Sequence, residues 1–125
     1  MFTYLCAVCN KPIADKKGAI HVSVTQAMNR RKQEANRIAN EPSSMPFKDV
    51  MQYVNNQIFQ AGWVPLHDTC VNAWEEKYPF GASYDIEASE LRTPEQFISQ
   101  TADLWAEPWF PYTAWDDFAR HLLGP

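Results

Sequence analysis

Hydrophobic and polar residues alternate over residues 18–24, and this period of two predicts a β-strand. The aliphatic side chains point to one side and His21 and Ser23 to the other, so we expect one buried and one exposed face. The following stretch, which runs to Asn40, is rich in helix formers and has Thr25 as its expected cap. Its apolar stripe is thin, which predicts a largely exposed helix. The stripe consists of Met28, Ala35, Ile38 and Ala39.

The middle of the chain predicts a loop, a helix, a short strand and another helix. Pro and Ser mark a loop at 41–46, and apolar residues at three-to-four spacing predict a helix at 47–60. The buried side of that helix would be Phe47, Val50, Met51, Val54, Ile58 and Phe59. Residues 63–66 predict a short strand. A helix then runs from His67 to about Tyr78, where Pro79 and Gly81 stop it.

The last third begins with an acidic segment at 85–90 and continues with two predicted helices. Thr93, Pro94 and Gln96 are the cap, first-position proline and third-position glutamine typical of a helix start. The expected buried side is Phe97, Ile98, Thr101, Leu104 and Trp105. After two prolines, a final helix places Trp115, Phe118, Ala119, Leu122 and Leu123 on one face and ends at Gly124.

Size and composition indicate one domain in a reducing compartment. The chain has 125 residues, 46% of them hydrophobic, which is enough for a single core. It lacks the roughly 20 consecutive apolar residues of a membrane helix and the basic, then apolar, start of a secretory signal. Its three cysteines cannot all pair as disulfides, so we expect a cytoplasmic protein with no membrane partner.

Charge is divided unevenly along the chain. Residues 1–60 carry eight Lys/Arg and four Asp/Glu, whereas residues 61–125 carry three and eleven, for a net charge of −4. The division is compatible with two faces that meet different partners, with two halves that attract each other, or with an uneven solvated surface.

Two pairs of residues have the spacing of metal ligands. Cys6 and Cys9 lie in a stretch that predicts a knuckle turn, and His67 and Cys70 open a helix, where residues three apart share a face. One imidazole and three thiolates complete a tetrahedral zinc shell. We therefore predict one structural Zn²⁺, because a complete shell leaves no position for a catalytic water.

A redox pair is the alternative for Cys6 and Cys9, with Cys70 as a small buried residue. A redox Cys-x-x-Cys usually follows a strand and opens a helix. Asn10, Lys11 and Pro12 start a helix poorly, so zinc is the favoured interpretation.

The order of knuckle, two strands and helix resembles a treble-clef zinc finger of the Cys-x-x-Cys…His-x-x-Cys type, as in the first half of LIM domains and in poly-ADP-ribose polymerase fingers. The resemblance covers residues 4–24 and 61–78, with Trp63 and Trp74 placed like the aromatics that pack such sites. Two features depart from it: 57 residues separate Cys9 from His67, and no cysteines remain for the second site of a LIM domain.

The resulting fold class is α+β, in a single domain of residues 1–125. A small treble-clef-like zinc-binding core of knuckle, β-hairpin and helix occupies residues 4–24 and 61–78. Residues 25–60 form a helical insertion, and residues 85–125 form an acidic, Trp-rich helical extension.

Binding of a protein partner is the favoured function. Large aromatic residues crowd an eleven-residue span among acidic neighbours, and Trp and Tyr dominate interface hot spots. The candidates are Trp105, Trp109, Phe110, Tyr112 and Trp115. Packing of these side chains in the core is the alternative, with Trp109, between two prolines, expected to remain exposed.

Binding of nucleic acid is the second hypothesis. The resemblance implies it, since fingers of the polymerase type bind DNA ends, and basic residues are available to meet phosphates. These are Lys16, Lys17, Arg30, Arg31, Lys32 and Arg37. The acidic chain and Glu34 among these residues oppose it.

Catalysis is not expected. Some treble clefs place a strand histidine in a metal-dependent nuclease site, and His21 lies on a predicted strand. No second histidine or asparagine pair completes such a site, and no glycine-rich phosphate loop is present. These features suit a non-enzymatic regulator or adaptor of the kind common in phages and mobile elements.

Overall fold

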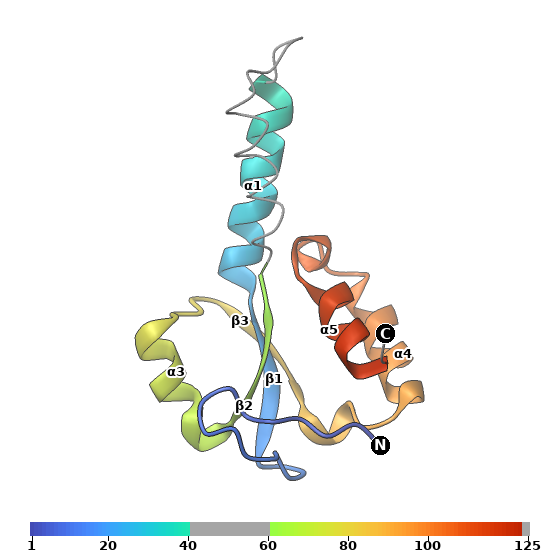
Figure 1. The fold of residues 1–125 in the computed structure, drawn as a ribbon. Helices are drawn as coiled ribbons and strands as arrows, with labels where there is room; N and C mark the ends of the chain where they lie inside the picture. The colour runs from blue at the N-terminus through green and yellow to red at the C-terminus, as the bar shows by residue number, and fades with distance from the viewer. Residues whose placement is uncertain (41–60, 124–125) are drawn as a thin grey trace.

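The computed structural model describes residues 1–40 and 61–123, which combine helices with an antiparallel sheet. The described part of the chain contains three strands in the order β2-β1-β3 (Figure 1). Their bounds are Gly18–Ser23 for β1, Trp63–His67 for β2 and Ser83–Glu87 for β3. Pro65 is tolerated within β2 because this strand lies at the sheet edge, where a missing N–H breaks no ladder.

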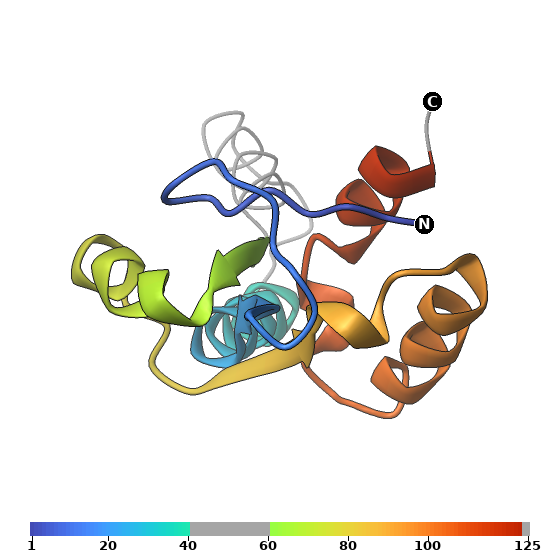
Figure 2. The same ribbon diagram turned by 90° about the horizontal axis from the view of Figure 1, so that it is seen from below.

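Helices cover both faces of the sheet. Helix α3, Val71–Lys77, lies on one side of the strands, while α4, Pro94–Leu104, and α5, Trp115–Leu123, lie on the other (Figures 1 and 2). As a result all six residues of the central strand β1 are buried, and the prediction of one exposed face is wrong. Its polar residues are covered by Phe80, whose ring stacks on His21 at 5.7 Å and whose carbonyl accepts a hydrogen bond from Ser23.

The acidic composition of residues 85–90 does not predict strand β3, which covers Ser83–Glu87. Tyr84, Ile86 and Ala88 turn inward while polar residues alternate with them, so the period-two signal was present but short. Pairing of β3 with β1 places Ile86 opposite Ile20, so the expected hairpin of two strands becomes a sheet with β1 at its centre.

Helix α1, Val24–Asn40, extends beyond the end of the sheet (Figure 1). Ser23, rather than the expected Thr25, caps it, because Ser23 Oγ accepts a hydrogen bond from the Gln26 N–H at 3.0 Å. The helix is largely exposed as predicted, through residue 35. Within residues 1–40 and 61–123, no helix has both the length and the apolarity needed to cross a bilayer. The loop predicted at 41–46 and the helix predicted at 47–60 lie outside the described residues.

Helix α4 begins where its sequence predicts. Thr93 and Gln96 form the reciprocal capping box, and Phe97 and Leu104 are buried. The burial predicted for Ile98 and Trp105 is wrong, since these side chains are 69% and 67% exposed. One narrow stripe of α4 packs inward through positions 97, 101 and 104, and a residue one position further along the helix turns about 100° away from it.

An aromatic core joins α4 and α5 to the sheet. Trp115 stacks on Phe97 at 4.9 Å and meets Trp63 edge-on at 4.7 Å. Trp109 packs against Tyr84 at 5.4 Å and is 6% exposed, so its expected exposure is wrong. The segment after Trp109 folds back as a short 3-10 turn, Phe110–Tyr112, which brings the connection against the sheet.

The amino-terminal arm, residues 1–15, is held against the start of α4. Buried Arg92 donates hydrogen bonds to the carbonyls of Phe2 and Ile13 and pairs with Asp15 at 2.9 Å. The Tyr4 hydroxyl donates to the carbonyl of Leu91. These contacts matter for the candidate site because the same arm carries Cys6 and Cys9.

Candidate metal centre

Cys6 and Cys9 lie in a tight turn of the amino-terminal arm. The Asn10 N–H donates to the Cys6 carbonyl at 2.8 Å, and the Cys6 N–H donates to the Lys11 carbonyl at 3.0 Å. Asn10 has φ 59°, a left-handed conformation that asparagine tolerates well. The turn does not open a helix, so it lacks the arrangement typical of a redox Cys-x-x-Cys pair.

His67 and Cys70 come from two different elements. His67 is the last residue of β2, and Cys70 ends the 3-10 turn Asp68–Cys70 and occupies the position just before α3. The prediction that both lie in the first turn of a helix is therefore wrong for His67. The backbone of His67 is extended, yet its ring and the Cys70 thiol still reach the same point, since their ligand atoms lie within 4.8 Å of each other. The Asp68 N–H donates to the Lys17 carbonyl at 3.0 Å, which holds this turn beside the start of β1.

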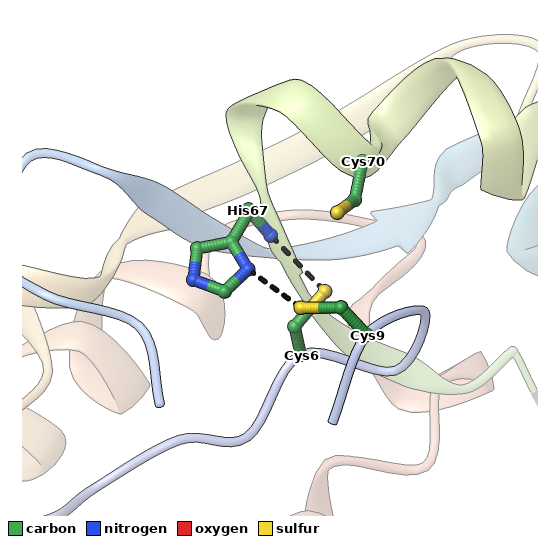
Figure 3. A group of neighbouring side chains, drawn as sticks. All are labelled: Cys6, Cys9, His67 and Cys70. Atoms are coloured by element: carbon green, nitrogen blue, oxygen red, sulfur yellow. Dashed lines mark hydrogen bonds between the residues drawn. The ribbon is translucent and has the colours of Figure 1, made fainter. Parts of the chain in front are cut away.

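The four side chains converge at one point (Figure 3). Their ligand atoms all lie within 4.8 Å of one another, and Cys9 Sγ is 3.2 Å from His67 Nδ1. In a tetrahedral site with Zn–S bonds of about 2.3 Å, neighbouring sulfurs are about 3.8 Å apart. Small side-chain shifts therefore centre all four donors on one ion, and the cluster can hold a metal.

The orientation of His67 suits a ligand. Its Nε2 lies 3.1 Å from the Pro12 carbonyl oxygen, which only accepts hydrogen bonds. Nε2 therefore carries the proton, and Nδ1 presents its lone pair to the cysteines. A second hydrogen bond that fixes the tautomer is usual for metal-binding histidines. Sequence reasoning missed Pro12 because a backbone carbonyl leaves no mark on residue types.

The local electrostatics favour a bound cation. Burial opposes ionisation of the Cys6 thiol, but hydrogen bonds from backbone N–H groups, His67 among them, outweigh it and lower its pKa to about 6. Desolvation and then the neighbouring Cys6 and Cys9 raise the pKa of Cys70. Three sulfurs at this separation resist joint ionisation, and a divalent cation at their centre removes that repulsion.

The aromatic residues predicted to bind a partner do not form one exposed surface. Trp109, Phe110 and Trp115 belong to the core, and Tyr112 is half-buried. Trp105 is exposed and rests edge-on against Phe110 at 5.1 Å. Trp63, expected near the metal ligands, lies at the other end of β2 from His67 and packs in the aromatic core.

The basic residues fall into two separate groups. Lys16 and Lys17 lie in the turn before β1, and Arg31 and Lys32 are exposed on α1, beyond the other end of that strand (Figure 1). The six-residue strand between the two groups spans roughly 20 Å by itself, and Arg31 lies two turns further along α1. The half-buried Arg30 is on α1 too, and Arg37 falls among residues whose side chains are outside the description.

Comparisons of the chain with protein-family models, with curated proteins and with solved structures find no match. The interpretation of the metal centre therefore depends on its own geometry and chemistry.

Proposed function

We propose that Cys6, Cys9, His67 and Cys70 bind one structural Zn²⁺. The support is the donor set, because three thiolates and one imidazole are ligands that Zn²⁺ prefers and together complete a tetrahedral shell. When bound, the ion supplies a cross-link between the amino-terminal arm and the junction of β2 with α3. Such ions commonly contribute folding free energy outright.

The treble-clef interpretation is part of this proposal. It is supported by the order of elements, since the knuckle turn precedes β1, β1 pairs with β2, and α3 follows Cys70. Strand β3 on the far edge of β1, together with α4 and α5, extends this core beyond a minimal finger.

Elemental analysis and cobalt substitution test the zinc site. Protein purified without chelator should contain one zinc per chain. Co²⁺ should give thiolate charge-transfer absorption and visible bands of tetrahedral intensity. Cys9→Ser should weaken both, while the Val8→Ala control, in the same turn, should not. Absence of stoichiometric metal would refute the proposal.

For the function of the module, we propose non-enzymatic binding of a protein partner through the outer face of α4. The observation that carries this proposal is the exposure of Ile98 and Trp105, at 69% and 67%. These residues are seven apart, so they share one face of the helix, with exposed Ala102 between them. Tryptophan is enriched in interface hot spots, and nearby exposed Asp103 and Glu107 would attract a basic partner.

Burial of His21 supports a role without catalysis. The imidazole is 8% exposed and stacked beneath Phe80, whereas a histidine that activates water must reach the substrate. The favoured role is therefore that of a binding or regulatory module.

Affinity capture tests the proposed surface. Tagged protein should retain a partner from cell lysate, and Trp105→Ala should release it. Leu5→Ala, which removes a 51% exposed apolar side chain from another surface, should retain it. Equal recovery with both variants would contradict the proposal. Circular dichroism confirms that each variant is folded.

Nucleic-acid binding is the second candidate, favoured by the projection of α1 with exposed Arg31 and Lys32 (Figure 1). Reversing both charges should abolish salt-sensitive retention on immobilised DNA or RNA if this helix meets phosphates. Unchanged retention would discard this candidate and leave the α4 surface.

A further inference from the structure

A groove lies on the face of the sheet opposite α4 and α5. It has a volume of about 210 Å³ and is formed by the start of α1, the edge strand β2, helix α3 and the segment that follows α3. Its lining residues are Ser23, Gln26, Gly62, Val64, Trp74, Tyr78, Pro79 and Phe80. None of these described lining residues has a charged side chain.

Aromatic rings form one wall of the groove. Trp74 and Tyr78, one turn apart on and just after α3, pack together with ring centroids 4.7 Å apart. Tyr78 remains 58% exposed despite that contact, so its ring is accessible from solvent. Phe80 is buried at the base, where it stacks on His21. The groove therefore offers aromatic faces, whose negative quadrupole attracts cations.

Helix α3 brings net negative charge to one wall of this groove. Asp85, Asp68 and Glu75 all lie close enough to act electrostatically on His21, directly behind Phe80. Burial lowers the pKa of His21 and keeps the imidazole neutral at neutral pH, so it does not cancel these carboxylates. On α3, the two carboxylates Glu75 and Glu76 outnumber the single cation Lys77. The aromatic wall that Trp74 contributes therefore belongs to a helix of net negative charge, and carboxylates also act electrostatically on the histidine that stacks on Phe80.

The size of the groove favours a side chain over a whole cofactor. Small-molecule pockets usually measure roughly 300–1,000 Å³, which exceeds the volume here. A planar guanidinium combines positive charge with the ability to stack on aromatic rings, and its aliphatic stem suits apolar walls such as Val64 and Pro79. Gln26 adds an amide that can accept a hydrogen bond.

We propose that this groove receives an arginine side chain from a basic segment of the partner protein. The proposal rests on the protein-binding function above and specifies the chemistry of the partner. It adds a contact on the opposite side of the sheet from α4, the helix with the surface proposed above (Figure 2), so the two surfaces are tested separately.

The probe is a hexapeptide with blocked, uncharged ends and two central arginines flanked by alanines. The comparison peptide carries citrulline in place of arginine, which keeps the shape of the side chain and removes its charge. Titration of ¹⁵N-labelled, zinc-loaded protein should shift the Trp74 indole and Gly62 amide signals saturably with the arginine peptide. The citrulline peptide should leave these signals unmoved. Tyr78→Leu, which keeps an apolar side chain but removes the π face, should weaken binding about fivefold.

Trp105→Leu is the matched control and should bind the arginine peptide as the wild type does. Equal binding of the citrulline peptide, an unaffected Tyr78→Leu variant, or shifts confined to the Trp105 indole would each overturn the groove proposal. Free arginine that binds as tightly as the peptide would overturn it too, since the occupant would then be a small metabolite. If capture of a partner still depends on Trp105 in any of these cases, the proposed function of the α4 surface remains and only the groove proposal fails. If the arginine peptide binds but capture does not depend on Trp105, only the α4 surface is refuted.

Discussion

Replacing Arg92 by alanine should remove a large part of the stability of this protein. The guanidinium is buried, and it donates to the backbone carbonyls of Phe2 and Ile13, which both belong to the arm that carries Cys6 and Cys9. Without Arg92, these carbonyls lose a charged partner, and the arm loses its attachment to the start of α4.

The expected loss follows from the individual contacts. A hydrogen bond from a charged donor contributes roughly 1.5–3 kcal/mol. The contact of Arg92 with the Tyr4 ring, at 5.7 Å, adds about 0.5–1 kcal/mol. The pair with Asp15 contributes little, because the Asp15 side chain is 65% exposed. Allowing for non-additivity, Arg92→Ala should destabilise the fold by about 3–5 kcal/mol, out of the roughly 5–15 kcal/mol typical of a domain.

Urea denaturation of the zinc-loaded protein, followed by tryptophan fluorescence and circular dichroism, measures this loss. Arg92→Lys keeps the charge but loses the fork of donors, so it should lie about halfway between wild type and Arg92→Ala. Asp15→Asn should cost less than about 1 kcal/mol. A loss below about 1 kcal/mol for Arg92→Ala, or an equal loss for Asp15→Asn, would refute the proposed attachment of the arm.

Three further predictions concern packing, capping and pH. Leu104→Ala should cost about 2–5 kcal/mol in urea denaturation because Leu104 is 1% exposed, whereas Ile98→Ala, on the outer face of the same helix, should cost less than about 1 kcal/mol. Ser23→Ala removes both the cap of α1 and the hydrogen bond to Phe80, and should cost about 1–3 kcal/mol; a loss under about 0.5 kcal/mol would contradict the capping role. The pKa of Cys6 is lowered to about 6 in the folded protein. In metal-free protein, the Cys6 thiolate should therefore contribute its full share of the free energy of unfolding above pH 9, the ordinary pKa of cysteine, and lose that share as the pH falls through 6. The pKa of Cys70 is raised, so zinc binding at pH 7 should release its proton, and calorimetry in buffers of different ionisation enthalpy should detect at least about one proton per ion.

Local features of this protein are determined by sequence alone. The capping box of α4 and the knuckle turn were predictable because each depends on interactions between residues at most a few positions apart. The spacing of Cys6 with Cys9 and of His67 with Cys70 likewise identified all four members of the cluster. Metal coordination requires these residue types, whatever fold the rest of the chain adopts.

The tertiary structure decided which surfaces are buried. Both Trp105 and Trp109 are large aromatic residues near prolines, yet the first faces solvent and the second packs beneath the sheet, because the segment after Trp109 folds back on it. Strand β1 is buried on two faces because α3 and the aromatic core approach it from opposite sides. The tautomer of His67 depends on a carbonyl 55 positions away in the chain. Burial and hydrogen bonding of this kind depend on which distant segments come into contact. These contacts are set by the fold of the whole chain and cannot be read from neighbouring residues in the sequence.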